Sequence, residues 1–138
     1  MAAVCFKHGF PDIPEAWKRL HDLMSCWHQM FNDTFDWQRD LECHTPTYFL
    51  SEAQRRVQNG ESVLRWVARE GFAWAINLEN QWMAEMQSIA RQIGNSDLLT
   101  YLATRDRDLQ QKALAALEGF KSLETLLALG EGQALKHS

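Results

Sequence analysis

Residues 46–93 read PTYFLSEAQRRVQNGESVLRWVAREGFAWAINLENQWMAEMQSIARQI and form the longest stretch of this chain that fits one helix. Between Val63 and Met86 the apolar residues extend beyond one stripe, so this helix is expected to be covered from more than one side. Its apolar residues recur mostly three and four positions apart, which is helical periodicity; they are Leu50, Ala53, Val57, Gly60, Leu64, Val67, Gly71, Trp74, Leu78, Trp82, Met86, Ile89 and Ile93.

Asn59-Gly60 is a potential break inside this helix. The three-four spacing of Val57, Gly60 and Leu64 nevertheless continues in phase across it, and glycine costs only about 1 kcal/mol in a helix interior. The spacing therefore favours a kink near Gly60 over a loop.

Two further helices are predicted, one on each side of the central stretch. Asp12 and Pro14 are typical of a helix start, and that helix is expected to run over about 14–43. Thr45-Pro46 predicts a corner, with the threonine hydroxyl capping the next helix. Gly94, followed by Ser96 as a cap, ends the central helix and begins a third over 96–129.

The third helix carries apolar residues at strict heptad spacing, with one polar member, which favours coiled-coil-like packing. These positions are Leu99, Leu102, Asp106, Leu109, Ala113, Ala116, Phe120, Leu123 and Leu127. The sequence thus predicts an all-α fold, an elongated up-down-up bundle of three long helices.

The chain of 138 residues is expected to form one domain, with an N-terminal arm (1–11) and a short flexible C-terminal tail (131–138). An unbroken helix over 46–93 would be about 70 Å long, against about 45 to 50 Å for each neighbour. Because one end would overhang and expose apolar surface, we expect a homo-oligomer.

The net charge of −4 argues against a general nucleic-acid binder, which usually presents a basic face. No secretion signal and no apolar run long enough to span a membrane is found. Three cysteines without disulfide-framework spacing favour reduced thiols, and hence a cytoplasmic location.

Residues that could carry chemistry show no spacing typical of an active site. No nucleophile elbow or phosphate-binding loop is present, so neither enzyme activity nor a cofactor is expected. Glu79 and Glu85 lie near the apolar arc of the central helix and are interpreted as boundary residues. Zinc sites usually contain close ligand pairs, and these are lacking among His21, Cys26, His28, Cys43 and His44.

Charge is unevenly distributed: 12–44 contains seven acidic and three basic residues, whereas 51–93 contains five of each. The basic cluster in the central helix is expected to pair with the acidic first helix; the alternative is an acidic or RNA-like ligand. The candidate electrostatic surface consists of Asp22, Asp33, Asp36, Asp40, Arg55, Arg56, Arg65 and Arg69.

The six tryptophans are spaced by eight or ten residues within each helix, so they cannot all lie on one stripe. One interpretation is a large aromatic core. The alternative is that tryptophans at the stripe edge anchor a partner, as aromatic residues often do at interfaces. The candidate interaction surface consists of Trp37, Trp66, Trp74, Ile76, Trp82 and Met83.

The helix QWMAEMQSIARQIG (81–94) followed by NSDLLTYLATRDRDLQQKALAALEGFKSLETLL (95–127) resembles the phasins, and the resemblance covers about 48–133. It implies a non-enzymatic bacterial protein that coats polyhydroxyalkanoate granules through apolar helix surface and often self-associates by coiled coil. The tryptophan content and the first helix, with its cysteines and histidines, depart from that family.

Three functions follow as hypotheses. The leading one is a phasin-like binding protein that lays Trp, Leu and Met surface on an apolar granule or a protein partner. The second is a small accessory or inhibitor subunit that docks on a larger enzyme or nucleoprotein complex through its acidic first helix. The third is a metal- or cofactor-binding helical bundle.

Overall fold

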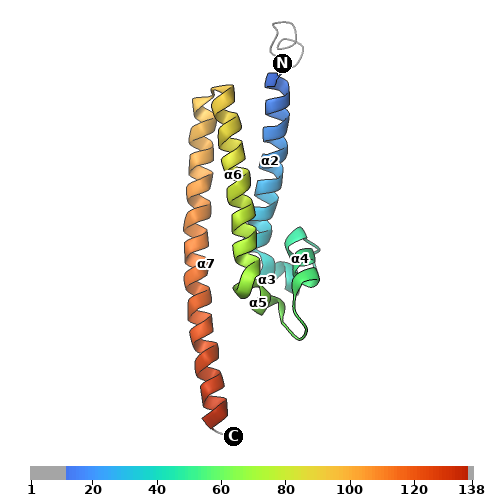
Figure 1. Cartoon of the computed structure of the whole chain (residues 1–138), viewed down its shortest axis with the longest axis vertical. Coiled ribbons are helices and arrows are strands. Elements are labelled where there is room, and N and C mark those ends of the chain that lie inside the picture. The colour runs from blue at the N-terminus through green and yellow to red at the C-terminus, as the bar shows by residue number, and fades with distance from the viewer. Residues whose placement is uncertain (1–11, 137–138) are drawn as a thin grey trace. The chain divides into compact units, whose positions relative to one another are not determined.

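The computed structural model describes residues 12–136, and the side-chain environments within 14–122, 125–126 and 129. These residues fold into helices and contain no strand, which confirms the all-α prediction (Figure 1). The helical segments are α2 (Asp12–Phe35), α3 (Trp37–Glu42), α4 (Tyr48–Arg56), α5 (Val63–Trp66), the π-helical η1 (Val67–Gly71), α6 (Phe72–Ile93) and α7 (Ser96–Lys136). The predicted arm, 1–11, lies outside the described residues.

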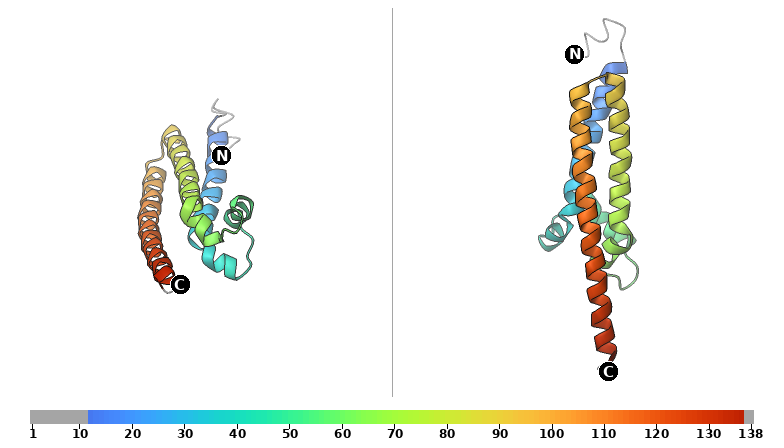
Figure 2. Two further views of the ribbon diagram at one scale, coloured as in Figure 1. Left: turned by 60° about the horizontal axis from the view of Figure 1, so that its bottom comes forward. Right: turned by 90° about the vertical axis from the view of Figure 1, so that its left-hand side faces the viewer.

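The chain divides into two compact units, and the boundary falls inside α7, between Asp106 and Arg107. In the first unit, α2 and α6 lie side by side (Figures 1 and 2). They run antiparallel, because Arg19 near the start of α2 pairs with Glu85 late in α6, whereas Phe35 at the end of α2 contacts Phe72 at the start of α6.

The core of the first unit is formed by the apolar stripe of α2, the inner face of α6, the short helices beside them and the start of α7. Burying one such large apolar side chain stabilises a fold by about 1.5 to 3 kcal/mol. The buried residues are Leu20, Leu23, Trp27, Met30, Phe31, Trp37, Phe49, Leu50, Ala53, Trp66, Val67, Phe72, Ala75, Met83, Met86, Ile89, Ala90 and Leu102.

The central stretch is not one helix, contrary to the kink favoured by its spacing. A loop over 57–62 separates α4 from α5. Gly60 adopts a φ of 80°, a left-handed conformation that glycine tolerates best. Ser62 then caps the new helix, its hydroxyl accepting a hydrogen bond from the Arg65 backbone N–H at 3.2 Å.

The first predicted helix is also interrupted, at Asp36, whose backbone (φ −103°, ψ 10°) leaves the helical region. The Asp36 N–H still donates to the Asn32 carbonyl at 2.8 Å, and the Asp40 N–H donates to the Asp36 carbonyl at 3.0 Å. Because helical hydrogen bonds continue on both sides, the chain bends there without forming a loop.

The predicted helix ends and caps agree with the structure in part. Gly94 ends α6 in a left-handed conformation, as expected. The side chain that caps α4 is Thr47, not Thr45, and the Asn95 side chain accepts from the Leu98 N–H at 3.0 Å at the start of α7. α7 continues past the predicted end at 129 to Lys136, so residues 131–136 are helical.

Candidate functional site

Aromatic and arginine side chains gather where α4 meets α5 and α6, and we call this group the α4–α6 aromatic cluster. The Phe49 ring contacts the rings of both Trp66 and Trp74, with centroid distances of 5.5 and 6.5 Å. Tyr48 contacts the Trp74 ring at 5.8 Å, and the Arg56 guanidinium lies over that ring at 4.9 Å. Phe49 and Trp66 are buried, whereas Tyr48 is 54% exposed, so the cluster reaches the surface.

Glu52 fixes the two arginines of α4. One of its carboxylate oxygens accepts from Arg55 Nη2 at 2.7 Å and from Arg56 Nε at 2.8 Å. The hydrogen bond from Arg55 and the charge of both guanidiniums hold the pKa of Glu52 below its ordinary value. Because Arg56 is held at this carboxylate, it is also held over Trp74, a cation–π contact worth about 0.5 to 1 kcal/mol.

Arg69 forms a second local network. Its guanidinium donates to both carboxylate oxygens of Glu61, at 2.8 and 2.9 Å, and pairs with Glu70 at 3.2 Å. Glu70 in turn accepts from the indole N–H of Trp66 at 2.8 Å. Arg55, Arg56 and Arg69 therefore pair with glutamates of their own stretch, and not with the acidic first helix as expected.

The residues of the candidate interaction surface differ in how deeply their side chains are buried. Trp37, Trp66 and Met83 are buried and offer little contact area to a partner in this fold. Trp74, Ile76 and Trp82 are partly buried, so each retains some accessible surface. Trp74 is the one of these that belongs to the α4–α6 aromatic cluster.

The acidic residues of the candidate electrostatic surface also differ in burial and in their partners. Asp22 is exposed, and Asp36 pairs with Arg39 at 3.4 Å. Asp33 is buried and accepts from the Gln29 side-chain amide at 3.1 Å. Burial raises the pKa of Asp33, and the carboxylates of Asp40 and Asp36 add to that rise against the Gln29 hydrogen bond.

The histidines and cysteines considered as metal ligands differ in their surroundings. Cys26 and Cys43 are exposed, and His28 Nε2 lies 3.2 Å from the Tyr101 hydroxyl. Burial lowers the pKa of His28, and the nearby Arg105 charge lowers it further. Within the described part of the chain, no three metal-binding side chains come together.

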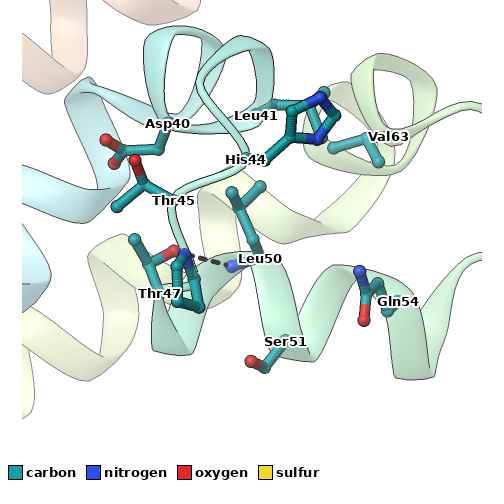
Figure 3. Close-up of a pocket in the computed structure, with 10 residues that line it drawn as sticks. Asp40, Leu41, His44, Thr45, Thr47, Leu50, Ser51, Gln54 and Val63 are labelled. Carbon is teal, nitrogen blue, oxygen red and sulfur yellow. Dashed lines mark hydrogen bonds between the residues drawn. The ribbon is translucent and has the colours of Figure 1, made fainter.

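A cavity of about 280 Å³ opens beside the turn that joins α3 to α4 (Figure 3). Its wall combines polar and apolar side chains from α3, the turn, α4 and the start of α5. The lining residues are Asp40, Leu41, His44, Thr45, Pro46, Thr47, Leu50, Ser51, Gln54 and Val63.

The second unit carries its own apolar surface on α7. Leu114, Leu117, Leu126 and Leu129 are 61%, 47%, 65% and 60% exposed. At about 100° per residue these leucines fall within about half of the helix circumference. We call them the α7 leucine face.

Sequence reasoning missed both Tyr48 and the α7 leucine face. The heptad positions drew attention to one side of this helix, and the exposed leucines lie between them. The signal was present in the sequence, because leucine occurs on more than one side of this helix.

No protein-family model, curated protein or solved structure matches this chain significantly. No helix within residues 12–136 combines the length and the apolar character needed to cross a membrane.

Proposed function

We propose that this protein acts by contact and without catalysis, laying apolar helix surface on a polyhydroxyalkanoate granule or on a protein partner, as phasins do. The α7 leucine face carries the proposal. Four large apolar side chains about half or more exposed on one helix are costly in water, since burying a leucine fully is worth about 1.5 to 3 kcal/mol.

The proposal includes the elongated three-helix arrangement and coiled-coil-like self-association predicted from the heptads, in a bacterial cytoplasm. Support for the packing part of this proposal comes from the heptad positions: Leu102, Leu109 and Ala113 are buried within the single chain, and Ala116 and Phe120 are half-buried. Because these positions are already covered, the contact with a second copy is assigned to the α7 leucine face. Leu123 and Leu127 lie outside the described side chains. A helix with apolar residues on several sides gains stability when a further surface covers it.

The test is adsorption of the purified full-length protein to polyhydroxybutyrate particles, measured by depletion from the supernatant. We expect binding to persist at about 1 M salt, because screening weakens charge contacts and leaves apolar ones. Replacing Leu114, Leu117, Leu126 and Leu129 by Gln is expected to lower the partition coefficient at least about tenfold.

The matched control carries Ser122→Gln and Thr125→Gln, two exposed polar positions of the same helix. It introduces the same side chain without removing apolar area, and is expected to adsorb like the parent. Equal adsorption by the leucine variant and the control would refute the granule proposal.

A second candidate function is docking on a larger enzyme or nucleoprotein complex through the acidic first helix. Asp22 is exposed on α2, and Asp36 and Asp40 retain partial exposure near its end. Asp33 is buried and adds little to such a surface. Affinity purification at about 50 mM and about 500 mM salt separates the two: charge-steered docking weakens with salt, and a stoichiometric complex lost at high salt would favour docking.

A further inference from the structure

The cavity beside the α3–α4 turn has the chemistry of a small-molecule site, independent of the contact function proposed above. At about 280 Å³ it is near the lower limit of volumes that hold organic ligands, about 300 Å³. Leu41, Leu50 and Val63 supply an apolar wall, and apart from Pro46 the remaining lining is polar (Figure 3).

The charge of this wall is one-sided. Among the described residues that line it, Asp40 is the only carboxylate and the His44 imidazole is the only basic side chain, and neither lysine nor arginine is present. Arg39, the next residue to Asp40, pairs instead with Asp36. Within the described residues no cation forms an ion pair with Asp40, so its partly buried carboxylate remains available to a ligand.

Further negative charge lies behind Asp40. The carboxylates of Asp40 and Asp36 both raise the pKa of the buried Asp33, so the three acids are within electrostatic range of one another. A positive charge at Asp40 would relieve this repulsion, and an anion there would increase it. The electrostatics therefore select a cation.

The turn that forms one side of the cavity is strained. His44 has a φ of 55°, and a left-handed conformation costs a residue other than glycine about 1 to 2 kcal/mol. Two backbone hydrogen bonds hold it: His44 N–H donates to the Leu41 carbonyl at 3.2 Å, and Thr45 N–H donates to the Asp40 carbonyl at 2.8 Å. Strain of this kind is concentrated at functional sites.

We propose that this cavity binds a compact organic cation of the alkylamine class. The ammonium group pairs with the Asp40 carboxylate, and the alkyl body lies against Leu41, Leu50 and Val63. A second polar group on the ligand reaches Ser51 and Gln54, which lie on the α4 side of the cavity (Figure 3). A short linear diamine meets all three requirements.

The experiment is titration of the full-length protein with 1,4-diaminobutane up to about 10 mM, followed by calorimetry and by amide chemical shifts. We expect saturable one-to-one binding, with shifts at Asp40, Leu50 and Gln54. Asp40→Asn is expected to weaken binding at least about tenfold, whereas the control Asp22→Asn, an exposed acid on α2, leaves it unchanged.

Ser51→Trp, which narrows the cavity without touching the carboxylate, is expected to abolish binding and keeps the test decisive if Asp40→Asn fails to fold. Circular dichroism checks the helix content of each variant. Absence of saturable shifts, equal affinity in Asp40→Asn, or equal affinity for the uncharged 1-butanol would each overturn the proposal.

Discussion

Glu79 is a carboxyl group fully buried in α6, and neither of its oxygens has a hydrogen-bond partner among the described residues. The Thr34 hydroxyl nearby donates instead to the Met30 carbonyl at 2.7 Å. Burial raises the pKa of Glu79 to about 8, and the Asp33 charge adds to the rise against the opposing influence of Thr34. At neutral pH this side chain is therefore mostly protonated.

Protonation of Glu79 makes stability pH-dependent. Its pKa is about 8 when folded and near 4.5 when unfolded, so between these values the folded chain holds more protons. The free energy of unfolding should fall as pH rises from 4.5 towards 8 and then level off, by about 3 to 5 kcal/mol at about 1.36 kcal/mol per pKa unit. Glu79→Gln should remove most of this decline, as measured by urea unfolding across that range.

Glu85→Gln is the control for this prediction, because Glu85 lies on the same helix but is exposed and paired with Arg19. The decline that Glu79 causes should persist in this variant. Asp33, whose pKa is also raised by burial, contributes a decline of the same sign in both variants. An unchanged pH profile in Glu79→Gln would show that the carboxyl is solvated in solution.

Sequence reasoning placed Glu79 near the apolar arc of its helix but interpreted it as a boundary residue, and it assigned Asp33 to a surface. Helical periodicity gives the direction of a side chain and not its depth. Depth depends on how closely a neighbouring helix approaches, which is a tertiary property. The burial of both acids at neighbouring helices could therefore not be read from spacing.

At the scale of elements, the π-helical turn η1 joins α5 to α6 and brings the Trp66 ring onto Gly71. A Cβ at Gly71 would lie 2.3 to 2.7 Å from three ring carbons of Trp66. The ring is buried and its indole N–H is bonded to Glu70, so it has little freedom to move. A glycine therefore occupies position 71 of the predicted apolar stripe because the Trp66 ring leaves no space for a larger side chain.

Gly71→Ala is expected to lower the free energy of unfolding by about 1 to 3 kcal/mol, the usual cost of overpacking a core. The matched control is Gly119→Ala in α7, where an added Cβ meets nothing within 4 Å. Alanine there should stabilise the helix by up to about 1 kcal/mol. Urea unfolding measures both, and a neutral effect at Gly71 would contradict the role assigned to Trp66.

The loop over 57–62 shows why the elements were predicted only in part. Val57 and Leu64 are seven residues apart, which is two helical turns, so a loop of this length leaves the apolar phase unchanged. Periodicity could not distinguish it from a kink. The local signals for a loop were Asn59-Gly60 and Ser62, which caps α5. These residues end one helix and begin the next, although the apolar spacing continues across them.

At the scale of the whole molecule, the all-α class was predictable because few glycines and prolines interrupt long periodic stretches. The division after Asp106 was not predictable, because the heptad spacing continues across it without change.

The exposed leucines beyond that division predict self-association. Sedimentation velocity at rising concentration should show an oligomer in the parent protein.

The variant with Gln at Leu114, Leu117, Leu126 and Leu129 should sediment as a smaller species at every concentration, because each replaced leucine removes apolar area from a contact. The Ser122→Gln and Thr125→Gln control should sediment like the parent. A monomeric parent protein would argue against association through this face.

All six tryptophans precede residue 83, so the unit from Arg107 onward contains none. Indole emission shifts to longer wavelength when water reaches the ring, and Trp27 and Trp66 are fully buried. Fluorescence therefore reports the melting of the first unit alone, whereas circular dichroism reports the helices of both. Any difference between the two melting curves measures how independently the part of α7 from Arg107 onward unfolds.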